Sequence, residues 1–410
     1  MNVLFVYSQD RLYGTNRPLE FAEYIPLGIS YISSILRQHG HKTSLIILSS
    51  YHKEKSQKLI KKKIREFVPR LICFTAVSTQ YNFIASIAGS ISERHPDIYM
   101  LIGGPHVSLN PEHVIAGPFN ALCIGEGEFA TLELVSHLEG GYIPKGIANL
   151  WVRRKNEVEK NPPRPFLKDL DVLPFPDREI WMDWLQPHDH PRFSILLGRG
   201  CPFECTYCCN HKLKRLAEGN YVRNRSPENI INEIQDLTTH YPAIKEIYLE
   251  VETIGVNLKW ILNLCKKLQD FNAMHSHAIA YGSNLRVTPK SDFEELFTAM
   301  SLANFTFINI GLESGSERVR REVLQRNYSN EDILRTSIQA RTHGLQVSFF
   351  NLIGIPGETI ADFYETVRVN QTCCPDWHET SIFYPYPGTK LYSLCEDRGL
   401  LSDRFQKNGA

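Results

Sequence analysis

The sequence predicts an α/β protein in which a doubly wound, Rossmann-like parallel sheet is followed by a second series of longer β–α units. Three observations carry this prediction. Through residue 140, short apolar runs alternate with amphipathic stretches at close spacing. From Phe193 the alternation resumes with six longer units. Between them lies a proline-rich stretch, and 410 residues suit two or three domains rather than one.

The first half is expected to hold five strands with helices between them. The strands are predicted at 2–7, 41–48, 71–77, 99–102 and 121–124, and the helices at 26–39, 56–67, 80–95 and after Glu128. The helix at 56–67 is rich in lysine, but its Leu59, Ile60 and Ile64 suit the core side of an amphipathic helix. We therefore interpret the lysines as a solvated face in preference to a patch for an anionic partner.

Glycines and small polar residues gather where strands of this half end. The turns include Ser78-Thr79, Gly103-Gly104-Pro105-His106 and Gly125-Glu126-Gly127-Glu128. The carboxyl edge of a doubly wound sheet is where ligands bind, and glycines let the backbone come close to a large ligand. Ordinary turns explain the pattern equally well, so both interpretations stay open at this point.

Residues 141–190 have a different character. Prolines recur in Pro162-Pro163-Arg164-Pro165 and in Leu173-Pro174-Phe175-Pro176-Asp177, which excludes a long helix. We expect a small hairpin-like extension at 142–157 and an ordered linker at 161–190. The predicted domains are therefore 1–140, a linker with a short extension at 141–190, a second domain at 191–400 and a tail at 401–410.

The second half is predicted to contain six strands and the helices between them. The strands are expected at 192–197, 246–251, 278–283, 305–311, 346–353 and 378–384, and the helices at 227–241, 258–271, 292–300, 332–343 and 359–372.

Three cysteines follow the first of these strands within eight residues. Cys201, Cys205 and Cys208 form C-x3-C-x2-C inside the glycine-flanked stretch 198–210. A [4Fe–4S] cluster held only by protein needs four cysteines, so three leave one iron open to a substrate or cofactor. Zinc or buried free thiols are the alternatives, but zinc usually takes two separated pairs of ligands and no second pair follows. Cys209 falls outside the spacing and is expected to be a small packed residue.

The composition excludes several classes of protein. The chain carries 45 basic and 45 acidic residues, a formal net charge of zero, which gives no electrostatic reason to bind nucleic acid. The N-terminus lacks the features of a signal peptide, and no apolar run approaches the ~20 residues that span a bilayer. We expect a cytoplasmic protein whose ten cysteines are reduced and available for metal.

The cysteine spacing resembles that of radical SAM enzymes. The resemblance implies that Cys201, Cys205 and Cys208 bind a [4Fe–4S] cluster, that its open iron takes S-adenosylmethionine, and that one electron cleaves this cofactor to a 5′-deoxyadenosyl radical. It also implies that the second half is a partial (β/α)6 barrel of the TIM type, with its chemistry at the carboxyl ends of the strands.

Those strand ends supply the residues that the resemblance assigns to S-adenosylmethionine. Glu252 takes the place of an acid that holds the amino group, with a solvent-facing glutamate as the alternative. Arg286 is expected to meet a carboxylate of the cofactor or substrate, or a structural acid. Glu313, in Gly-Leu-Glu-Ser-Gly, is expected to bind ribose hydroxyls or an arginine. Tyr207 is placed beside the cluster, Gly354 and Gly357 near the adenosyl group, and the stretch 384–389 near the adenine. Glu358 is also assigned to the cofactor, with capping of the next helix as an equal alternative.

The first half resembles the cobalamin-binding domain that precedes many radical SAM domains. Eight residues are implied to line the corrinoid and its nucleotide tail: Ser78, Thr79, Gly103, Gly104, Pro105, Gly125, Glu126 and Gly127. Typical cobalamin domains carry Asp-x-His-x-x-Gly, whose histidine binds cobalt, but here Leu12 and Thr15 follow Asp10 in the places of His and Gly. We therefore expect cobalamin without a protein histidine on cobalt, and His106 as a turn residue that contacts the ligand or solvent.

Together the two resemblances imply a cobalamin-dependent radical SAM enzyme. The radical would abstract hydrogen from an organic substrate, and methylcobalamin would deliver a methyl group to that carbon. The alternatives are a cyclase or rearrangement enzyme without methyl transfer, and a non-catalytic corrinoid- or cluster-binding protein. The expected partners are a small-molecule or natural-product intermediate and an electron donor such as flavodoxin or ferredoxin. Many relatives carry a further C-terminal domain that shapes the substrate pocket, so the sequence leaves the substrate open.

Overall fold

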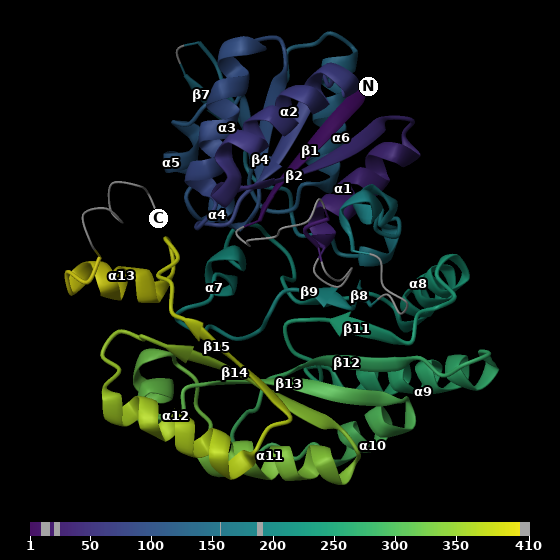
Figure 1. Ribbon diagram of the computed structural model, residues 1–410, viewed down its shortest axis with the longest axis vertical. Helices are drawn as coiled ribbons and strands as arrows, with labels where there is room; N and C mark the ends of the chain where they lie inside the picture. Colours follow the sequence, from purple (N-terminus) through teal and green to yellow (C-terminus); the bar gives the residue numbers. More distant parts are fainter. Residues whose placement is uncertain (10–16, 20–24, 156, 187–191, 402–410) are drawn as a thin grey trace.

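The chain folds around two parallel sheets that lie one above the other in Figure 1. The structure is a computed structural model that describes residues 1–410 except 10–16, 20–24, 156, 187–191 and 402–410. The carboxyl edge of the upper sheet is turned toward the lower one, and the proline-rich segment crosses between them. The predicted α/β class is confirmed, with a doubly wound sheet first and a partial barrel second.

The first sheet has the strand order β2-β1-β3-β4-β5-β6-β7. Its parallel strands are β1 (Asn2–Gln9), β2 (Lys42–Ser49), β3 (Leu71–Thr75), β4 (Tyr99–Gly103) and β5 (Ala121–Cys123). The antiparallel hairpin β6 (Leu150–Arg153) and β7 (Val158–Lys160) extends the β5 edge, where the sequence predicted a small extension. The strand order reverses between β1 and β3, which creates a crevice at the carboxyl edge.

Helices cover both faces of this sheet. They are α1 (Leu27–Gln38), α2 (Lys53–Phe67), α3 (Tyr81–Arg94), α4 (Pro105–Leu109), α5 (Pro111–Ile115) and α6 (Glu128–Glu139), with a 3-10 turn at Ser50–His52. Side chains alternate along β1, so Val3 and Phe5 pack in the core that contains α1 and α6, while Leu4 and Val6 pack in the core that contains α2 and α3. A strand buried on both faces therefore appears in the sequence as a continuous apolar run.

The linker binds both halves of the molecule. Asp177 accepts hydrogen bonds from Ser33 Oγ at 2.6 Å and from Arg37 Nη1 at 2.8 Å, both on α1. The next residue, Arg178, pairs with the buried Glu233 of the second half at 2.6 Å. Two consecutive side chains thus bind different halves of the molecule. The segment also contains short 3-10 turns at Leu170–Val172 and Glu179–Trp184.

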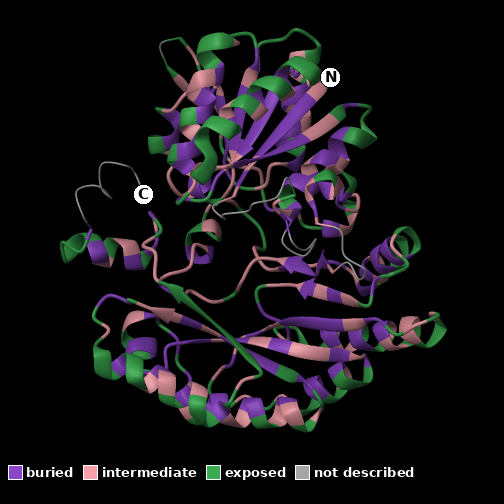
Figure 2. Ribbon diagram, in the orientation of Figure 1, coloured by how far each residue is buried: buried purple, intermediate pink, exposed green. Residues whose placement is uncertain are grey.

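The second sheet has six parallel strands in the order β15-β14-β13-β12-β11-β8. The strands are β8 (Phe193–Leu196), β11 (Glu246–Glu250), β12 (Ala280–Leu285), β13 (Phe305–Glu313), β14 (Gln346–Ile353) and β15 (Trp377–Ile382). The connecting helices are α8 (Pro227–His240), α9 (Leu258–Met274), α10 (Glu294–Leu302), α11 (Asn330–Thr342) and α12 (Ile360–Cys373). They cover the outer face, so the open inner side is turned toward the first sheet (Figure 1). Figure 2 shows buried residues along the central strands, whereas every residue of β15 is exposed at the sheet edge.

Short elements around the cysteines are absent from the sequence predictions. A two-stranded ribbon pairs β9 (Gly198–Arg199) with β10 (Arg223–Asn224), and two further helices are α7 (Asn210–Leu213) and α13 (Lys390–Asp397), while a π-helical turn spans Val319–Val323. Two-residue strands and single helical turns such as α7 give no periodic pattern, because their pairing is set by residues far away in the chain, whereas the eight-residue α13 was simply missed.

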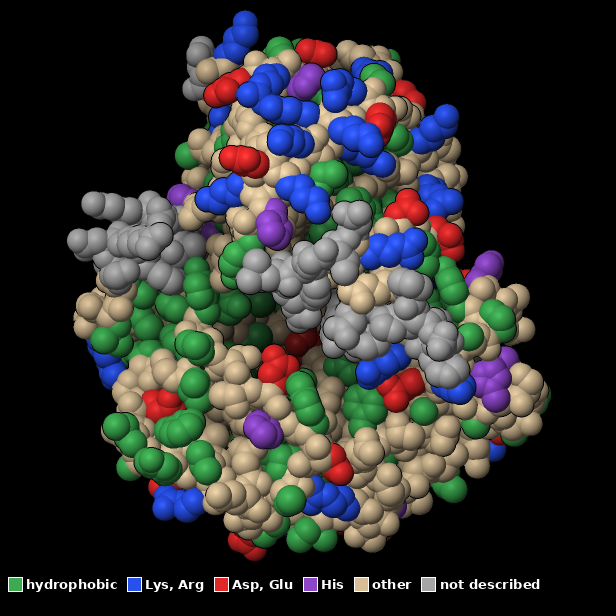
Figure 3. All heavy atoms as spheres, viewed as in Figure 1, with side chains coloured by type: hydrophobic (Ala, Val, Ile, Leu, Met, Phe, Trp, Pro, Cys, Tyr) green, Lys and Arg blue, Asp and Glu red, His purple; other side chains and the backbone are tan. Residues whose placement is uncertain are grey.

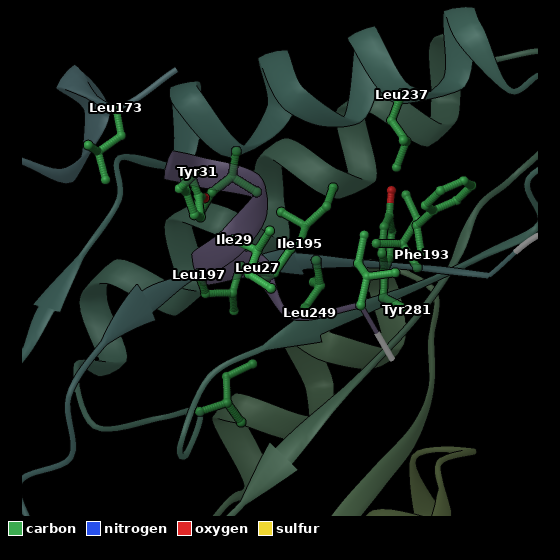
Figure 4. Close-up of a cluster of buried hydrophobic side chains, with 14 of the residues drawn as sticks. Leu27, Ile29, Tyr31, Leu173, Phe193, Ile195, Leu197, Leu237, Leu249 and Tyr281 are labelled. Atoms are coloured by element: carbon green, nitrogen blue, oxygen red, sulfur yellow. The ribbon is translucent and has the colours of Figure 1, made fainter. Parts of the chain in front are cut away.

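One hydrophobic core runs through both halves. Leu27, Ile29 and Tyr31 of α1 lie beside Ile195 and Leu249 of the second sheet and Leu197, which directly follows β8 (Figure 4). Because burial of this apolar surface is shared, the core stabilises the arrangement of the two sheets as well as each sheet by itself.

We expect Gly282→Ala to destabilise the second sheet. A Cβ atom at Gly282 would lie 2.0 Å from Cζ of Phe307 on the neighbouring strand, and overpacking of this kind typically costs about 1–3 kcal/mol. Gly89→Ala in helix α3 is the matched control, since the nearest atom would be 4.0 Å away. Thermal unfolding followed by circular dichroism should give a lower midpoint for Gly282→Ala only. Equal midpoints for both variants would contradict the packing argument.

Candidate active site between the two sheets

A cavity of about 500 Å³ lies between the carboxyl edge of the first sheet and the second half of the chain. The turns after β4 and β5 supply six of the predicted ligand residues to its wall: Gly103, Gly104, Pro105, Gly125, Glu126 and Gly127. The opposite wall includes Arg199, Gly200 and Tyr221, which belong to the segment around the cysteines. One cavity therefore contacts both predicted cofactor regions.

Two glycines at this cavity have no tolerated replacement. Gly104 has φ of +103°, and a Cβ atom there would lie 2.8 Å from the carbonyl oxygen of Ala76. Gly200, directly before Cys201, has φ of +89°, and its Cβ would lie 2.2 Å from the carbonyl oxygen of Tyr221. Positive φ and close backbone contact both require glycine, so these residues fix the paths of the two walls.

The two remaining residues predicted for cobalamin do not line this cavity. Ser78 is buried, and its hydroxyl hydrogen-bonds Nδ1 of His106 at 2.9 Å, while Thr79 is exposed. The expected contact of His106 with solvent is wrong, because its ring is fully buried in α4 against the rings of Tyr81 and His113, while its contact with a ligand stays a prediction. Burial, and then the neighbouring His113, lower the pKa of His106 to about 4, so the ring is neutral.

The cysteine loop is held by backbone contacts to distant segments. Thr206, within the loop, donates its hydroxyl to the carbonyl of Val323 at 2.6 Å and accepts the N–H of Leu391 at 3.0 Å. Tyr207 follows, and its hydroxyl accepts from Arg326 at 2.8 Å. The loop is therefore positioned by the protein itself at the mouth of the second sheet.

The three motif cysteines are free thiols, and Cys201 and Cys208 differ in their electrostatics. Burial raises the pKa of Cys201 to about 11. The hydrogen bond with Cys209, with help from the N–H groups of Asn210 at 3.4 and 3.5 Å, lowers the pKa of Cys208 to about 7. Three thiols on one loop are a suitable donor set for a cluster, because bound iron favours the thiolate form that ligation requires.

Among the residues that the structure describes, no group of three or more His, Cys, Asp or Glu side chains converges on a position for a metal ion. That finding concerns side chains that share a single metal ion. Each thiolate of a [4Fe–4S] cluster binds a different iron atom, so the finding does not test the cluster. The assignment of Cys201, Cys205 and Cys208 as cluster ligands therefore stays a prediction.

Arg286 lies at the cysteine loop. Its Nη1 is 2.6 Å from Sγ of Cys205, and its guanidinium lies 3.9 Å from the ring centre of Phe203, which precedes Cys205 by two residues. Its neighbours are thus a thiol and an aromatic face in place of the structural acid that was one expected partner, while contact with a carboxylate of the cofactor or substrate stays a prediction.

Glu313 is engaged by an arginine, one of the two partners expected for it. The residue has φ of +61°, and its carboxylate pairs with the buried Arg326. Arg326 also donates to the carbonyl of Gly311 at 3.0 Å and to the hydroxyl of Tyr207. Glu313 and Tyr207 are thus joined through one guanidinium, which connects β13 to the cysteine loop.

The carboxylates after β11 face the same region. Glu252 is exposed, and its charge contributes to raising the pKa of Cys201, so it lies within electrostatic range of the loop. Glu250, which the sequence analysis missed, lines the cavity. Burial, and then the charge of Glu252, raise the pKa of Glu250 to about 7. The alternation of an apolar strand gave no reason to single out Glu250.

The expectation that Glu358 caps the following helix is wrong. The cap of α12 is a box made by Thr359 and Asp362, each of which bonds the backbone N–H of the other. The carboxylate of Glu358 instead accepts the N–H of Gly354 at 2.7 Å and closes the turn that contains Gly354 and Gly357. Burial raises its pKa, although these backbone N–H groups oppose the shift.

A buried ion-pair network joins the two cavity walls. Glu126 pairs with Arg199 at 3.0 Å and with Arg223 at 2.8 Å, and Arg199 also pairs with Glu128 at 2.5 Å. Arg199 and Arg223 are directly opposite each other in the β9–β10 ribbon. Burial by itself would raise the pKa of Glu126, but the hydrogen bond from Arg223 and the charges of both arginines hold it below the ordinary value. The sequence analysis assigned Glu126 to a ligand and missed both arginines.

The residues that replace the cobalt-binding motif, Asp10, Leu12 and Thr15, lie outside the described residues. The absence of a protein histidine on cobalt therefore stays a prediction.

We expect Glu126→Gln to weaken the contact between the two halves. Loss of a carboxylate that satisfies two largely buried arginines should cost about 1–3 kcal/mol at neutral pH. The pKa of Glu126 is lower in the folded protein than in the unfolded chain. The stabilisation by this carboxylate is therefore complete above the pKa of the unfolded chain, about 4.3, and is lost as the pH falls through the lower pKa of the folded protein. Thermal midpoints of the variant and the wild type should therefore differ at pH 7 and converge on acidification. The exposed Glu93 of α3 gives the matched control, Glu93→Gln, which should equal the wild type at each pH. A variant difference that grows in acid would contradict the network.

Similar proteins cover nearly the whole chain. The chain is 28% identical over 398 residues to an uncharacterized methyltransferase from Pyrococcus horikoshii, an alignment that covers 95% of this chain and 81% of that protein. It is 23% identical over 418 residues to the anaerobic magnesium-protoporphyrin IX monomethyl ester cyclase from Rubrivivax gelatinosus, with 99% of this chain and 72% of that protein covered. The fold is similar to that of the radical S-adenosylmethionine methyltransferase TsrM from Kitasatospora setae, with a TM-score of 0.75, 16% identity, and coverage of 97% of this chain and 75% of that one.

Two family models divide the chain between them. The B12 binding domain matches residues 21–135, which include the glycine turns of the first sheet, and the radical SAM superfamily matches residues 195–369, which include the cysteine loop. The matches support cobalamin, a [4Fe–4S] cluster and S-adenosylmethionine as cofactors of the chain. No helix in the described part of the chain has the length and apolar character needed to cross a membrane. The chain belongs to the family of radical SAM proteins that carry a B12-binding domain.

Proposed function

We propose that this radical SAM enzyme uses cobalamin to methylate a carbon atom of a small organic molecule. The observation that carries the proposal is the shared cavity, because the glycine turns of the B12-binding domain and the strand that leads into the cysteine loop line the same space. A methyl carrier and a radical source can act on one substrate only if both face it.

The residues present suit the three cofactors. Cys201, Cys205 and Cys208 would hold the cluster, and Gly104 and Gly125 would allow a flat corrinoid to lie against the edge of the first sheet. When bound, the cluster with S-adenosylmethionine supplies one-electron chemistry and cobalamin supplies a carrier for a methyl group. The protein contributes position: Arg326 fixes Tyr207 next to the cysteines, and Glu126 fixes the cavity wall on the other side.

We further propose that no protein histidine binds cobalt. Among the described residues, the wall of the cavity contains no histidine. His106, the histidine nearest in sequence to the glycine turn, is buried, and Ser78 hydrogen-bonds its Nδ1.

The relatives support methyl transfer, since two of the three described above are named methyltransferases, and TsrM has also been solved with tryptophan as its substrate. A small molecule of comparable size is the proposed substrate class for this chain.

A second candidate function keeps the cofactors and omits methyl transfer. The relative from Rubrivivax gelatinosus is named a cyclase, and its alignment spans 99% of this chain. A cyclase or rearrangement enzyme would consume S-adenosylmethionine without placing a methyl group on the product. The methylation state of the product therefore separates the two functions.

The proposed chemistry depends on three cysteines, so Cys205→Ala should abolish it. After anaerobic reconstitution with iron, sulfide and hydroxocobalamin, the wild type should bind about four iron atoms and, on reduction with S-adenosylmethionine, form 5′-deoxyadenosine. Cys205→Ala should lose both the cluster and this product.

Cys374→Ala is the matched control, because Cys374 is an exposed free thiol at the end of α12, outside the motif. It should retain iron and product. Persistent 5′-deoxyadenosine from Cys205→Ala would refute the ligand assignment, and its absence from the wild type, with cobalamin still bound, would indicate a non-catalytic corrinoid carrier. With a substrate in hand, formation of S-adenosylhomocysteine together with a methylated product distinguishes methyl transfer from cyclisation.

A further inference from the structure

We propose that a group of exposed cations around Glu204, on the cysteine loop, is the docking surface for an acidic protein that donates one electron. We call this group the loop cation cluster; it comprises Lys214, Arg215 and Lys390. The proposal rests on the proposed function, since it names the partner that would reduce the bound cluster.

These three cations converge on one carboxylate. Nitrogen atoms of Lys214, Arg215 and Lys390 lie 3.8, 3.9 and 3.6 Å from the carboxylate oxygens of Glu204. Their side chains are 43%, 63% and 39% exposed. Lys214 and Arg215 follow helix α7, whereas Lys390 begins helix α13, so the tertiary fold brings the group together from separate parts of the chain.

Stability does not account for this arrangement. An exposed ion pair contributes little to stability, and one carboxylate neutralises one cation, so the other cations repel each other. Distances of 3.6–3.9 Å are also longer than those of a charge-assisted hydrogen bond. The result is a local excess of positive charge on a chain whose formal net charge is zero. Such an excess attracts an acidic partner and accelerates its encounter.

The position of the group suits electron delivery. Glu204 directly precedes Cys205, and Lys214 follows Cys208 by six residues. Lys390 is adjacent to Leu391, whose N–H bonds the carbonyl of Thr206 inside the loop. The exposed cations therefore lie beside the loop that would hold the cluster.

A second basic surface serves as a contrast. Lys58, Lys61 and Lys62 are exposed on α2, which packs on the face of the first sheet, and Lys and Arg side chains gather over this upper part of the molecule in Figure 3. Helix α2 lies well above α7 in Figure 1, so this surface supplies a control with the same number of charges.

The partner is identified by its chemistry as a low-potential flavin or iron–sulfur protein with an acidic surface. In the proposed step the reduced donor loses one electron and the bound cluster gains that electron. No bond is formed or broken and no proton is transferred.

The test compares two triple variants of the reconstituted full-length protein. Lys214, Arg215 and Lys390 are replaced by Gln in one variant, and Lys58, Lys61 and Lys62 are replaced by Gln in the other. Each protein is mixed with pre-reduced flavodoxin in a stopped-flow instrument, and reduction is followed by the loss of cluster absorbance.

At low ionic strength we expect the loop variant to be reduced about tenfold more slowly than the wild type, and the α2 variant to stay within about twofold of the wild-type rate. Added salt should slow the wild type and narrow the gap between it and the loop variant.

Reduction by photoreduced 5-deazaflavin, a small neutral reductant, separates docking from folding. All three proteins should contain equal iron and react with this reductant at equal rates. A loop variant that flavodoxin reduces as fast as the wild type would overturn the proposal, as would equal slowing of both variants or a wild-type rate that does not change with salt. A wild type that neither reductant reduces would instead refute the proposed function on which the docking surface rests.

Discussion

The carboxylate of Glu126 joins the two halves of the molecule. It lies in the glycine turn after β5 and pairs with Arg199 and Arg223, which form opposite positions of the β9–β10 ribbon. Arg199 is two residues before the first motif cysteine. A single ion-pair network therefore fixes the distance between the predicted cobalamin edge and the predicted cluster loop. Because the charges are largely buried and mutually satisfied, displacing either wall would expose an unpaired charge, which is costly.

The apolar contacts act in the same direction as this network. Side chains of α1 pack in the same core as β8 and β11, and the linker binds α1 through Asp177 and the second half through Arg178. Hydrophobic burial supplies most of the stabilisation but has no directional preference, whereas hydrogen-bonded ion pairs define one orientation. The cavity of about 500 Å³ is the space that remains between two walls held in this way.

The cysteine loop is held by contacts to several distant segments of the chain. Thr206 bonds the segments at Val323 and Leu391, Tyr207 is held by Arg326, and Arg286 contacts Cys205. Such positioning matters for a cofactor enzyme, in which the protein places the reactive atoms while the cofactors supply the difficult chemistry. The loop then has two functional sides in our proposals, one toward the cavity and one toward an electron donor.

The sequence by itself determined the fold class, the cysteine motif and the glycine turns, because each of these depends on residues within a few positions of one another. Repeated apolar runs predict strands, and three cysteines within eight residues share a loop in any fold. Only the tertiary structure decided which distant side chains meet. It paired Glu126 with arginines 73 and 97 residues away, gave the hydroxyl of Ser78 to His106, and placed Arg286 on Cys205. Local periodicity reports which face of an element is buried, but the partner of a buried charge is chosen by the packing of whole elements.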